Sequence, residues 1–352
     1  MINSLKTKII KTIYSDNYKN PLFSLRFFLF ILSKLYSTAV DLRIFLYKKS
    51  ILKSYKSSAF IISIGNITAG GTGKTPMAVY LARFLTNKGL KPAIVMRGYK
   101  GRFEKTGGIA CDGKNLKADF NNAGDEAVLL CSKLEGVPVL CGHNKKESVK
   151  KAEKEFKANV IIFDDGFSHL KLKRDLDLLL LDYKKPFGNF FTLPRGILRE
   201  KKKNLKRADA IIYTRTENPQ LSFNNTFFSF HHTEVDKIIP GLKSLENKKP
   251  FLFCGIGNNQ SFYSSVQKFG FNVKSSLFFD DHHKYSTKDI KKIINKAKED
   301  YCDCFLTTTK DYCRIKENNI SFPFDLIVMD AEIKFYCNGF DNFLKKRLKQ
   351  IE

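Results

Sequence analysis

The stretch AFIISIGNITAGGTGKTP, residues 59–76, decides the fold of this chain. Its apolar, β-branched beginning predicts a buried strand, which breaks into a glycine-rich loop that ends at Lys74 and Thr75. An amphipathic segment follows and predicts a helix whose positive N-terminus faces the same loop. A strand, a glycine loop and a helix in this order are typical of sites where backbone N–H groups wrap a polyphosphate. The stretch therefore predicts nucleotide binding.

The loop departs from the pattern GxxxxGK[ST] at one position, because Thr68 stands where the first glycine is expected. Three glycines remain inside the turn and let the backbone approach phosphate oxygens closely. We expect Lys74 to reach the β- and γ-phosphates of ATP and the hydroxyl of Thr75 to bind Mg²⁺. The predicted nucleotide-binding residues are Thr68, Ala69, Gly70, Gly71, Thr72, Gly73, Lys74 and Thr75.

The rest of the chain alternates apolar runs with helical patterns. Four further runs, at 91–99, 159–167, 175–182 and 208–215, read as buried strands of a parallel sheet covered by helices. This pattern predicts an α/β fold of the phosphate-loop NTPase type with a second, smaller α/β domain. The second domain is indicated by strands at 249–258, 304–311 and 325–330 and a helix at 286–300. The predicted boundaries are an interfacial helix at 1–48, a phosphate-loop domain at 49–215, a linker or β-ribbon at 216–235 and the smaller domain at 236–352.

Composition limits the classes of partner. The formal charge is +26, from 61 Lys and Arg residues against 35 Asp and Glu residues, which implies an anionic partner such as nucleic acid, a membrane surface or a phosphorylated substrate. No nucleic-acid-binding signature accompanies the charge, so we expect no nucleic acid. The eight cysteines lack CxxC spacing, which favours reduced thiols in the cytoplasm over a zinc site.

Residues 20–47 predict one helix, opened by Asn20 as its cap and Pro21 in its first turn. Its longest charge-free stretch, 27–33, is far shorter than the ~20 apolar residues that a spanning helix needs. Wound as a helix, it has a wide apolar face, which predicts a helix lying on an anionic membrane surface. The alternative is that this face packs on the core of the protein. The opposite, polar side holds Arg26, Ser33, Lys34, Ser37 and Asp41.

Three groups of polar residues are candidates for chemistry. Asp164 and Asp165 end an apolar strand, which is the place of an acid that holds Mg²⁺ near bound phosphates. Asp125 and Glu126 precede an apolar helix and could equally be helix caps. His282 lies in an Asp-His-His run that could equally be a surface turn.

Taken together, the motifs resemble those of the tetraacyldisaccharide 4'-kinase family of lipid A biosynthesis. The resemblance extends from about residue 60 to residue 311 and includes motifs that are not general phosphate-loop signatures. The motifs are GNxTxGGTGKTP (65–76), RGY (97–99), GDE (124–126), DDGFxH (164–169), LPRGxLRE (193–200), GIGN (255–258), FxDHH (279–283) and TxKD (308–311).

The resemblance implies transfer of the γ-phosphate of ATP to the 4'-hydroxyl of a tetraacyl glucosamine disaccharide 1-phosphate. It implies Asp125 as the catalytic base, working with His282 and Lys74, and we expect the two domains to approach before Asp125 and His282 meet. A monomer at the cytoplasmic face of the bacterial inner membrane is expected. The metal is expected at Thr75, Asp164, Asp165 and Glu126, and the lipid substrate at Arg97, Tyr99, Lys145 and Arg195.

The chain departs from the family pattern at two further positions. Ser168 stands where the family usually has Gln, and Lys145 stands where an Arg is common, which keeps the charge but loses bidentate geometry. An alternative from another class is a nucleotide-switch ATPase of the partitioning or metallochaperone kind. That alternative leaves Asp125, His282 and the LPRG segment without a role.

Overall fold

A computed structural model describes residues 2–15, 19–218, 224–239, 248–316, 322–349 and 351. Contacts between Cα atoms group the chain into two compact units. The first unit consists of Met1–Met96, Asn144–Phe230 and Ile333–Glu352, and the second of Arg97–His143 and His231–Glu332. This grouping differs from the contiguous boundaries predicted from the sequence, because residues 97–143 belong with the C-terminal half of the chain.

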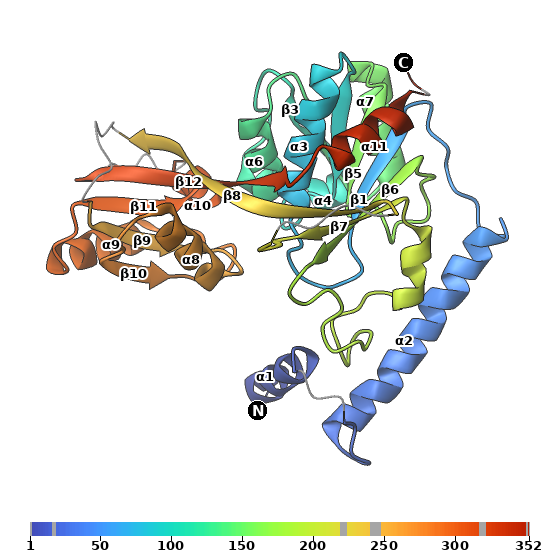
Figure 1. Cartoon of the computed structure of the whole chain (residues 1–352), viewed down its shortest axis with the longest axis horizontal. Helices are drawn as coiled ribbons and strands as arrows, with labels where there is room; N and C mark the ends of the chain where they lie inside the picture. Colours follow the sequence, from blue (N-terminus) through green and yellow to red (C-terminus); the bar gives the residue numbers. More distant parts are fainter. Residues whose placement is uncertain are drawn as a thin grey trace. The chain divides into compact units, whose positions relative to one another are not determined.

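The core of the first unit is a parallel sheet in the order β7-β6-β1-β5-β2. Every residue of β1 is buried, as expected for a central strand covered on both faces. Helix α3 (Lys74–Asn87) packs on β1, β2 and β5, and α7 (Lys145–Phe156) packs on β2 (Figure 1). The predicted parallel α/β fold is confirmed. The strands are β1 Phe60–Gly65, β2 Pro92–Met96, β5 Val160–Asp164, β6 Leu176–Asp182 and β7 Ala210–Thr214.

Two helices precede this sheet, α1 (Ile2–Ile13) and α2 (Leu25–Lys48). The predicted start of the second helix is wrong. Its N-cap is Ser24, whose Oγ accepts a hydrogen bond from Phe27 N at 3.2 Å, and Pro21 lies in a turn before it. Asn20 does not cap the helix because its Oδ1 accepts a hydrogen bond from Arg195 Nε at 2.7 Å.

The second unit contains a parallel sheet in the order β10-β9-β11-β12. Phenylalanines from β9 and β11 pack with the apolar side of α9 in one cluster, and α8 covers another. The predicted second α/β pattern is therefore confirmed, although the strand predicted at 304–311 ends at Thr308 and continues as a helix. The elements are β9 Pro250–Cys254, α8 Asn259–Phe269, β10 Ser275–Phe278, α9 Thr287–Glu299, β11 Cys304–Thr308, α10 Thr309–Lys316 and β12 Asp325–Phe335.

Residues 97–143 add a small subdomain to the second unit, which the sequence did not predict. Its two short strands, β3 (Gly108–Asp112) and β4 (Pro138–Cys141), pair antiparallel. Helix α6 (Asp125–Lys133) packs on both strands and on α10. Two one-turn helices precede it, α4 Phe103–Thr106 and α5 Phe120–Ala123.

The predicted linker or β-ribbon at 216–235 contains the beginning of a strand, β8 (Thr226–Ile239), and residues 219–223 lie outside the described part of the chain. Strands β8 and β12 each contribute residues to both units (Figure 1). The remaining elements are the 3₁₀ helix η1, Lys202–Arg207, and helix α11, Gly339–Leu348, both in the first unit.

Candidate functional site

The glycines of the phosphate loop allow a left-handed backbone. Gly70 has φ of 117° and Gly73 has φ of 86°, values that L side chains rarely adopt. Gly73 is also the N-cap of α3, so Lys74 is the first residue of the helix and Thr75 the second. The loop therefore brings the helix N-terminus to the carboxyl end of β1, as predicted.

Carbonyl groups of the loop are held from one side by the end of β7. Thr214 Oγ1 donates to Thr72 O at 3.1 Å, and Arg215 Nη2 donates to Gly71 O at 2.9 Å. In a trans peptide the C=O and the following N–H point in opposite directions. The N–H groups of Thr72 and Gly73 therefore point away from Thr214 and Arg215, which is the orientation that anion binding requires.

The first part of the phosphate loop is fixed by backbone hydrogen bonds to another segment. Ala69 N donates to Ile197 O at 2.7 Å, and Arg199 N donates to Ile67 O at 2.7 Å, so the loop pairs with the LPRGILRE segment. Thr68 is buried and its carbonyl accepts from the side chain of Asn66 at 2.7 Å. The N–H of Ala69 is thus already used, which corrects the prediction that Ala69 offers this group to phosphate. We expect the phosphate contacts at residues 70–75.

The end of β5 faces two cations. Asp165 Oδ1 lies 3.6 Å from Lys74 Nζ, and both carboxylate oxygens accept from Arg199 Nη1, at 3.0 and 2.8 Å. Burial alone would raise the pKa of Asp165, but the charges of Lys74 and Arg199 outweigh it and lower the pKa below its ordinary value. Asp165 is therefore ionised beside the phosphate-loop lysine.

Oxygen donors at this edge suit a hard cation such as Mg²⁺. Asp164 ends β5 and Asp165 follows it, while Thr75 is the second residue of α3, which the phosphate loop joins to β1, the strand paired with β5. Mg²⁺ is usually held by one or two carboxylates together with substrate phosphates, rather than by an all-protein cage. The donor set fits that role. Glu126, the fourth predicted ligand, lies on α6 in the second unit.

Two loops of the second unit touch through their backbones. A Cβ added to Gly124 would lie 2.5 Å from Tyr99 O, and one added to Gly101 would lie 2.5 Å from Asn122 O. Gly98 and Gly124 also have φ of 70° and 83°. The glycines of the motifs at 97–101 and 122–126 therefore let these loops pack closely and fix the start of α6, where Asp125 is the first residue.

Asp125 and His282 are in direct contact. His282 Nδ1 lies 2.8 Å from Asp125 Oδ2, and the Tyr99 ring lies with its centroid 6.2 Å from that of the imidazole. Both residues belong to the second unit, so the prediction that they meet only when two domains approach is wrong. The reason is that residues 97–143 fold with the C-terminal half of the chain.

A third side chain, Arg314, completes this group and was missed by the sequence analysis. It donates to Asp125 Oδ2 from Nε at 3.0 Å and from Nη2 at 2.5 Å. Burial would raise the pKa of Asp125, but the hydrogen bonds from His282 and Arg314 and the charge of Arg314 lower it to about 2. The only local signal was its position three residues after Asp311 in the TxKD motif, on one face of a helix.

The four predicted substrate residues differ in their surroundings. In the second unit, Arg97 is exposed and pairs with Glu104 at 2.7 Å, and Tyr99 is exposed. In the first unit, the ammonium of Lys145 is buried over the ring of Phe163. These three roles stay predictions.

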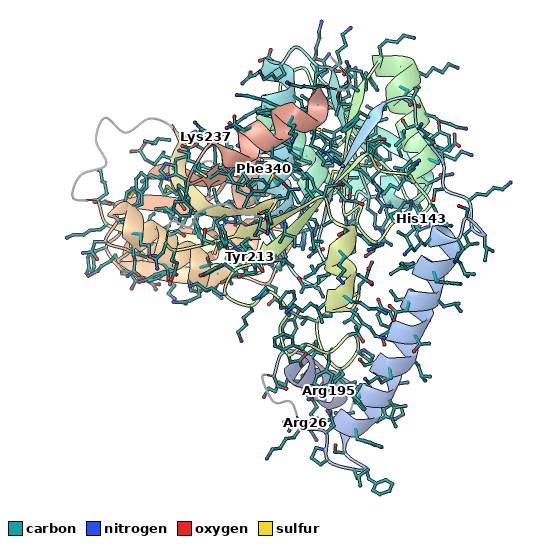
Figure 2. All side chains as sticks on the ribbon, turned by 45° about the vertical axis from the view of Figure 1, so that its right-hand side comes forward. Arg26, His143, Arg195, Tyr213, Lys237 and Phe340 are labelled. Atoms are coloured by element: carbon teal, nitrogen blue, oxygen red, sulfur yellow. The ribbon has the colours of Figure 1, made fainter. Side chains whose placement is uncertain are left out.

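Arg195 is fully buried, and its predicted role as a substrate residue stays a prediction. Its guanidinium lies over the Phe191 ring and bonds to Asn20 Oδ1 and to Thr12 O, at 2.7 and 3.4 Å. Figure 2 shows Arg195 close to Arg26 and to α1. Arg195 therefore attaches the N-terminal helices to the LPRG segment.

The family model for tetraacyldisaccharide-1-P 4'-kinase matches residues 25–349. The chain belongs to this family. Two curated tetraacyldisaccharide 4'-kinases, from Desulfatibacillum aliphaticivorans and Halothermothrix orenii, are 38% and 35% identical to it. Each alignment covers 91% of this chain and, respectively, 92% and 89% of the relative. The predicted resemblance to the tetraacyldisaccharide 4'-kinases is confirmed.

A solved structure supports the same assignment. The crystal structure of LpxK from Aquifex aeolicus in complex with ATP matches with a TM-score of 0.76 at 29% identity, covering 93% of this chain and 99% of that one. The tetraacyldisaccharide 4'-kinase family therefore accounts for the fold of both units. In the described residues, no helix is both long enough and apolar enough to pass through a bilayer.

Proposed function

We propose that this protein transfers the γ-phosphate of ATP to the 4'-hydroxyl of a tetraacyl glucosamine disaccharide 1-phosphate, giving a lipid IVA type of product in lipid A biosynthesis. The observation that carries the proposal is the hydrogen bond between His282 and Asp125. The same chain has a phosphate loop whose carbonyl groups accept hydrogen bonds from Thr214 and Arg215. A kinase acting on an alcohol needs both a polyphosphate site and a group that accepts the hydroxyl proton.

The first unit binds the nucleotide in this proposal. Backbone N–H groups of residues 70–75 and the Lys74 ammonium would hold the phosphates, and Thr75 with Asp164 or Asp165 would hold Mg²⁺. When bound, Mg²⁺ neutralises charge on the β- and γ-phosphate oxygens. Asp165 keeps the Lys74 ammonium at the loop through their contact at 3.6 Å.

The second unit supplies the base. Asp125 accepts the proton of the 4'-hydroxyl as that oxygen bonds to the γ-phosphorus, and the bond from phosphorus to the β-phosphate oxygen breaks to leave ADP. The carboxylate is ionised at neutral pH, since its pKa is about 2. His282 fixes the direction of the carboxylate through Oδ2, and Oδ1 is then the oxygen expected to face the hydroxyl.

The N-terminal helix places the enzyme at a lipid surface. The polar side of α2 packs on the first unit, since Ser33 Oγ lies 2.7 Å from Thr192 Oγ1 and Asp41 pairs with Lys201 at 2.9 Å. Large apolar side chains on α2 are exposed instead, namely Phe28, Ile31, Leu35, Leu42 and Phe45. This arrangement supports contact with a membrane surface over packing of this apolar face in the protein core. We propose that the enzyme acts there as a monomer, at the cytoplasmic face of the bacterial inner membrane.

The nucleotide-switch ATPase is not favoured, because it gives no role to the pair of Asp125 and His282. The test is to incubate the protein with Mg²⁺, [γ-³²P]ATP and detergent-dispersed acyl disaccharide 1-phosphate. The expected product is a bis-phosphorylated lipid, with ATP consumed only when lipid is present. ATP hydrolysis that is independent of lipid, with no labelled lipid, would contradict the proposal.

A further inference from the structure

The buried side chain of Arg314 joins three parts of the second unit. Its Nε and Nη2 donate to Asp125 Oδ2, at the start of α6, and its Nη1 donates to Gly255 O, after β9, at 3.0 Å. The same Nη1 donates to Asp311 Oδ1 on its own helix, α10, at 3.1 Å. Because the guanidinium is planar and rigid, it fixes the directions of all these partners at once.

His282 contacts two of the same partners. Its backbone N–H donates to Gly255 O at 3.3 Å, and its Nδ1 lies 2.8 Å from Asp125 Oδ2. Arg314 and His282 therefore share Asp125 and Gly255 as partners, and they also contact each other, since Arg314 Nη2 lies 3.5 Å from His282 Nδ1. His282 also has φ of 65°, an uncommon conformation for a residue other than glycine, which persists only where surrounding contacts hold it.

Asp311 fixes Arg314 from the other side. Its carboxylate is fully buried and accepts hydrogen bonds from Gly255 N at 3.0 Å, Tyr285 Oη at 3.0 Å and Thr308 Oγ1 at 2.6 Å. These donors come from the residue after β9, from the loop before α9 and from the last residue of β11. The Arg314 guanidinium thus cannot rotate without breaking a buried ion pair, which is a costly change.

We propose that Arg314, held by Asp311, is a positioning residue that sets the Asp125 carboxylate and the His282 imidazole in the geometry needed to accept the hydroxyl proton. This inference rests on the proposed function, because it assigns Asp125 and His282 to the phosphoryl transfer. Arg314 acts through Asp125 and His282, because only 5% of its side chain is exposed and its Nη2 contacts both Asp125 Oδ2 and His282 Nδ1.

The kinetic test compares three variants. In Arg314→Met we expect kcat for lipid phosphorylation to fall about 100-fold, because displacement of a reacting group by about 1 Å has an effect of this size. The KM for ATP should stay within about twofold of wild type, since only the transition-state geometry changes. Arg314→Lys keeps the cation and should recover part of the lost kcat. If Arg314→Met does not fold, the kcat of Arg314→Lys is compared with that of wild type instead, and it should be lower.

The matched control is Lys133→Met, which removes another partly buried cation from the second unit. Lys133 pairs with Asp330 and lies in the last turn of the helix that begins at Asp125. We expect this variant to keep the wild-type kcat even where it is less stable. A kcat near wild type in Arg314→Met, or an equal loss of kcat in Lys133→Met, would overturn the proposal.

A second measurement does not depend on activity. In protein labelled with ¹⁵N-histidine, the Nδ1 signal of His282, assigned from a His282→Gln spectrum, should shift in Arg314→Met and stay unchanged in Lys133→Met. An unchanged His282 signal in folded Arg314→Met would show that Arg314 does not position the imidazole. If wild-type protein phosphorylates no lipid, the proposed function fails, and these spectra still decide whether Arg314 sets the pair.

Discussion

One carboxylate oxygen, Asp125 Oδ2, receives all three hydrogen bonds from His282 and Arg314. Asp125→Asn keeps the volume of the side chain but removes its capacity to accept a proton. We expect the turnover of lipid to fall roughly 10²–10⁴-fold, the usual range for loss of a general base, while ATP affinity is unchanged. Titration calorimetry with ATP and a product assay would separate the two effects. The control is Lys74→Met, which should weaken ATP binding as well, and wild-type turnover in Asp125→Asn would remove Asp125 from the mechanism.

The same carboxylate makes stability depend on pH. The pKa of Asp125 is about 2 in the folded protein and ~3.9 in an unfolded chain. Ionised Asp125 therefore stabilises the folded protein fully above the unfolded-state pKa, and this stabilisation is lost as the pH falls through the folded-state pKa. The shift corresponds to at most about 3 kcal/mol of the free energy of unfolding at pH 7, because solvent screening of the partly exposed carboxylate reduces it. Urea unfolding of wild type and Asp125→Asn should therefore differ more at pH 7 than at pH 3. An equal difference at both pH values would contradict the low pKa.

Single residues of the site were predictable only where a motif or the family resemblance named them. Motifs named Lys74 and Asp165, which lie 3.6 Å apart, whereas Arg314 contacts Asp125 across 189 positions of sequence and has only its spacing from Asp311 as a local signal. The expectation for the N–H of Ala69 erred for the opposite reason, and the predicted substrate role of Arg195 stays a prediction. A motif names the residue type, but only tertiary packing shows that the N–H of Ala69 and the guanidinium of Arg195 already have partners.

At the scale of elements, the end of β7 orients the phosphate loop. Arg215 has φ of 60°, pairs with Asp182 at the end of β6 and donates to Gly71 O. Arg215→Met should weaken ATP binding roughly tenfold, because a hydrogen bond from a charged group contributes about 1.5 kcal/mol. Calorimetric titration with ATP measures this loss. Lys184→Met is the control, since Lys184 forms an exposed ion pair with Glu217 and should leave affinity unchanged. Equal affinities in wild type and Arg215→Met would show that the loop holds its shape unaided.

Elements with strong local patterns were predicted well, and those set by distant partners were not. The run into β1 and the glycine loop before α3 are fixed by hydrophobic burial and by backbone freedom. Helix α2 begins four residues later than the Asn20-Pro21 pattern indicates, because Arg195 binds Asn20. The antiparallel strands β3 and β4 were missed because their sequences, GIACD and PVLC, do not alternate apolar and polar residues.

At the scale of the whole molecule, the chain passes between the two units at residues 96–97, 143–144, 230–231 and 332–333. Sequence order alone suggested a cut near residue 215, which would separate Asp125 from His282. Hydrophobic patterning reports which residues are buried but not which parts of a chain they are buried against. The presence of two α/β units was therefore predictable, while the assignment of residues 97–143 was not.

Attachment of the whole molecule to lipid is the last prediction, and it depends on apolar area and on charge together. Leu35 and Leu42 on α2 are 64% and 56% exposed, and burial of a leucine side chain in an apolar phase contributes about 2 kcal/mol. The double change Leu35→Glu and Leu42→Glu replaces this gain with two carboxylates that anionic lipids repel. We expect binding to vesicles of mixed neutral and anionic lipids, measured by sedimentation, to fall at least about 100-fold.

The control for the membrane prediction is Tyr301→Glu, which changes an aromatic side chain that is 85% exposed in the second unit. It should leave vesicle binding unchanged, and the double variant should keep its ATP affinity because the phosphate loop is untouched. High salt should weaken wild-type binding in part, since the net charge of +26 acts through screened attraction while apolar burial does not. If the double variant sediments with vesicles as wild type does, the membrane contact is made by a surface other than α2.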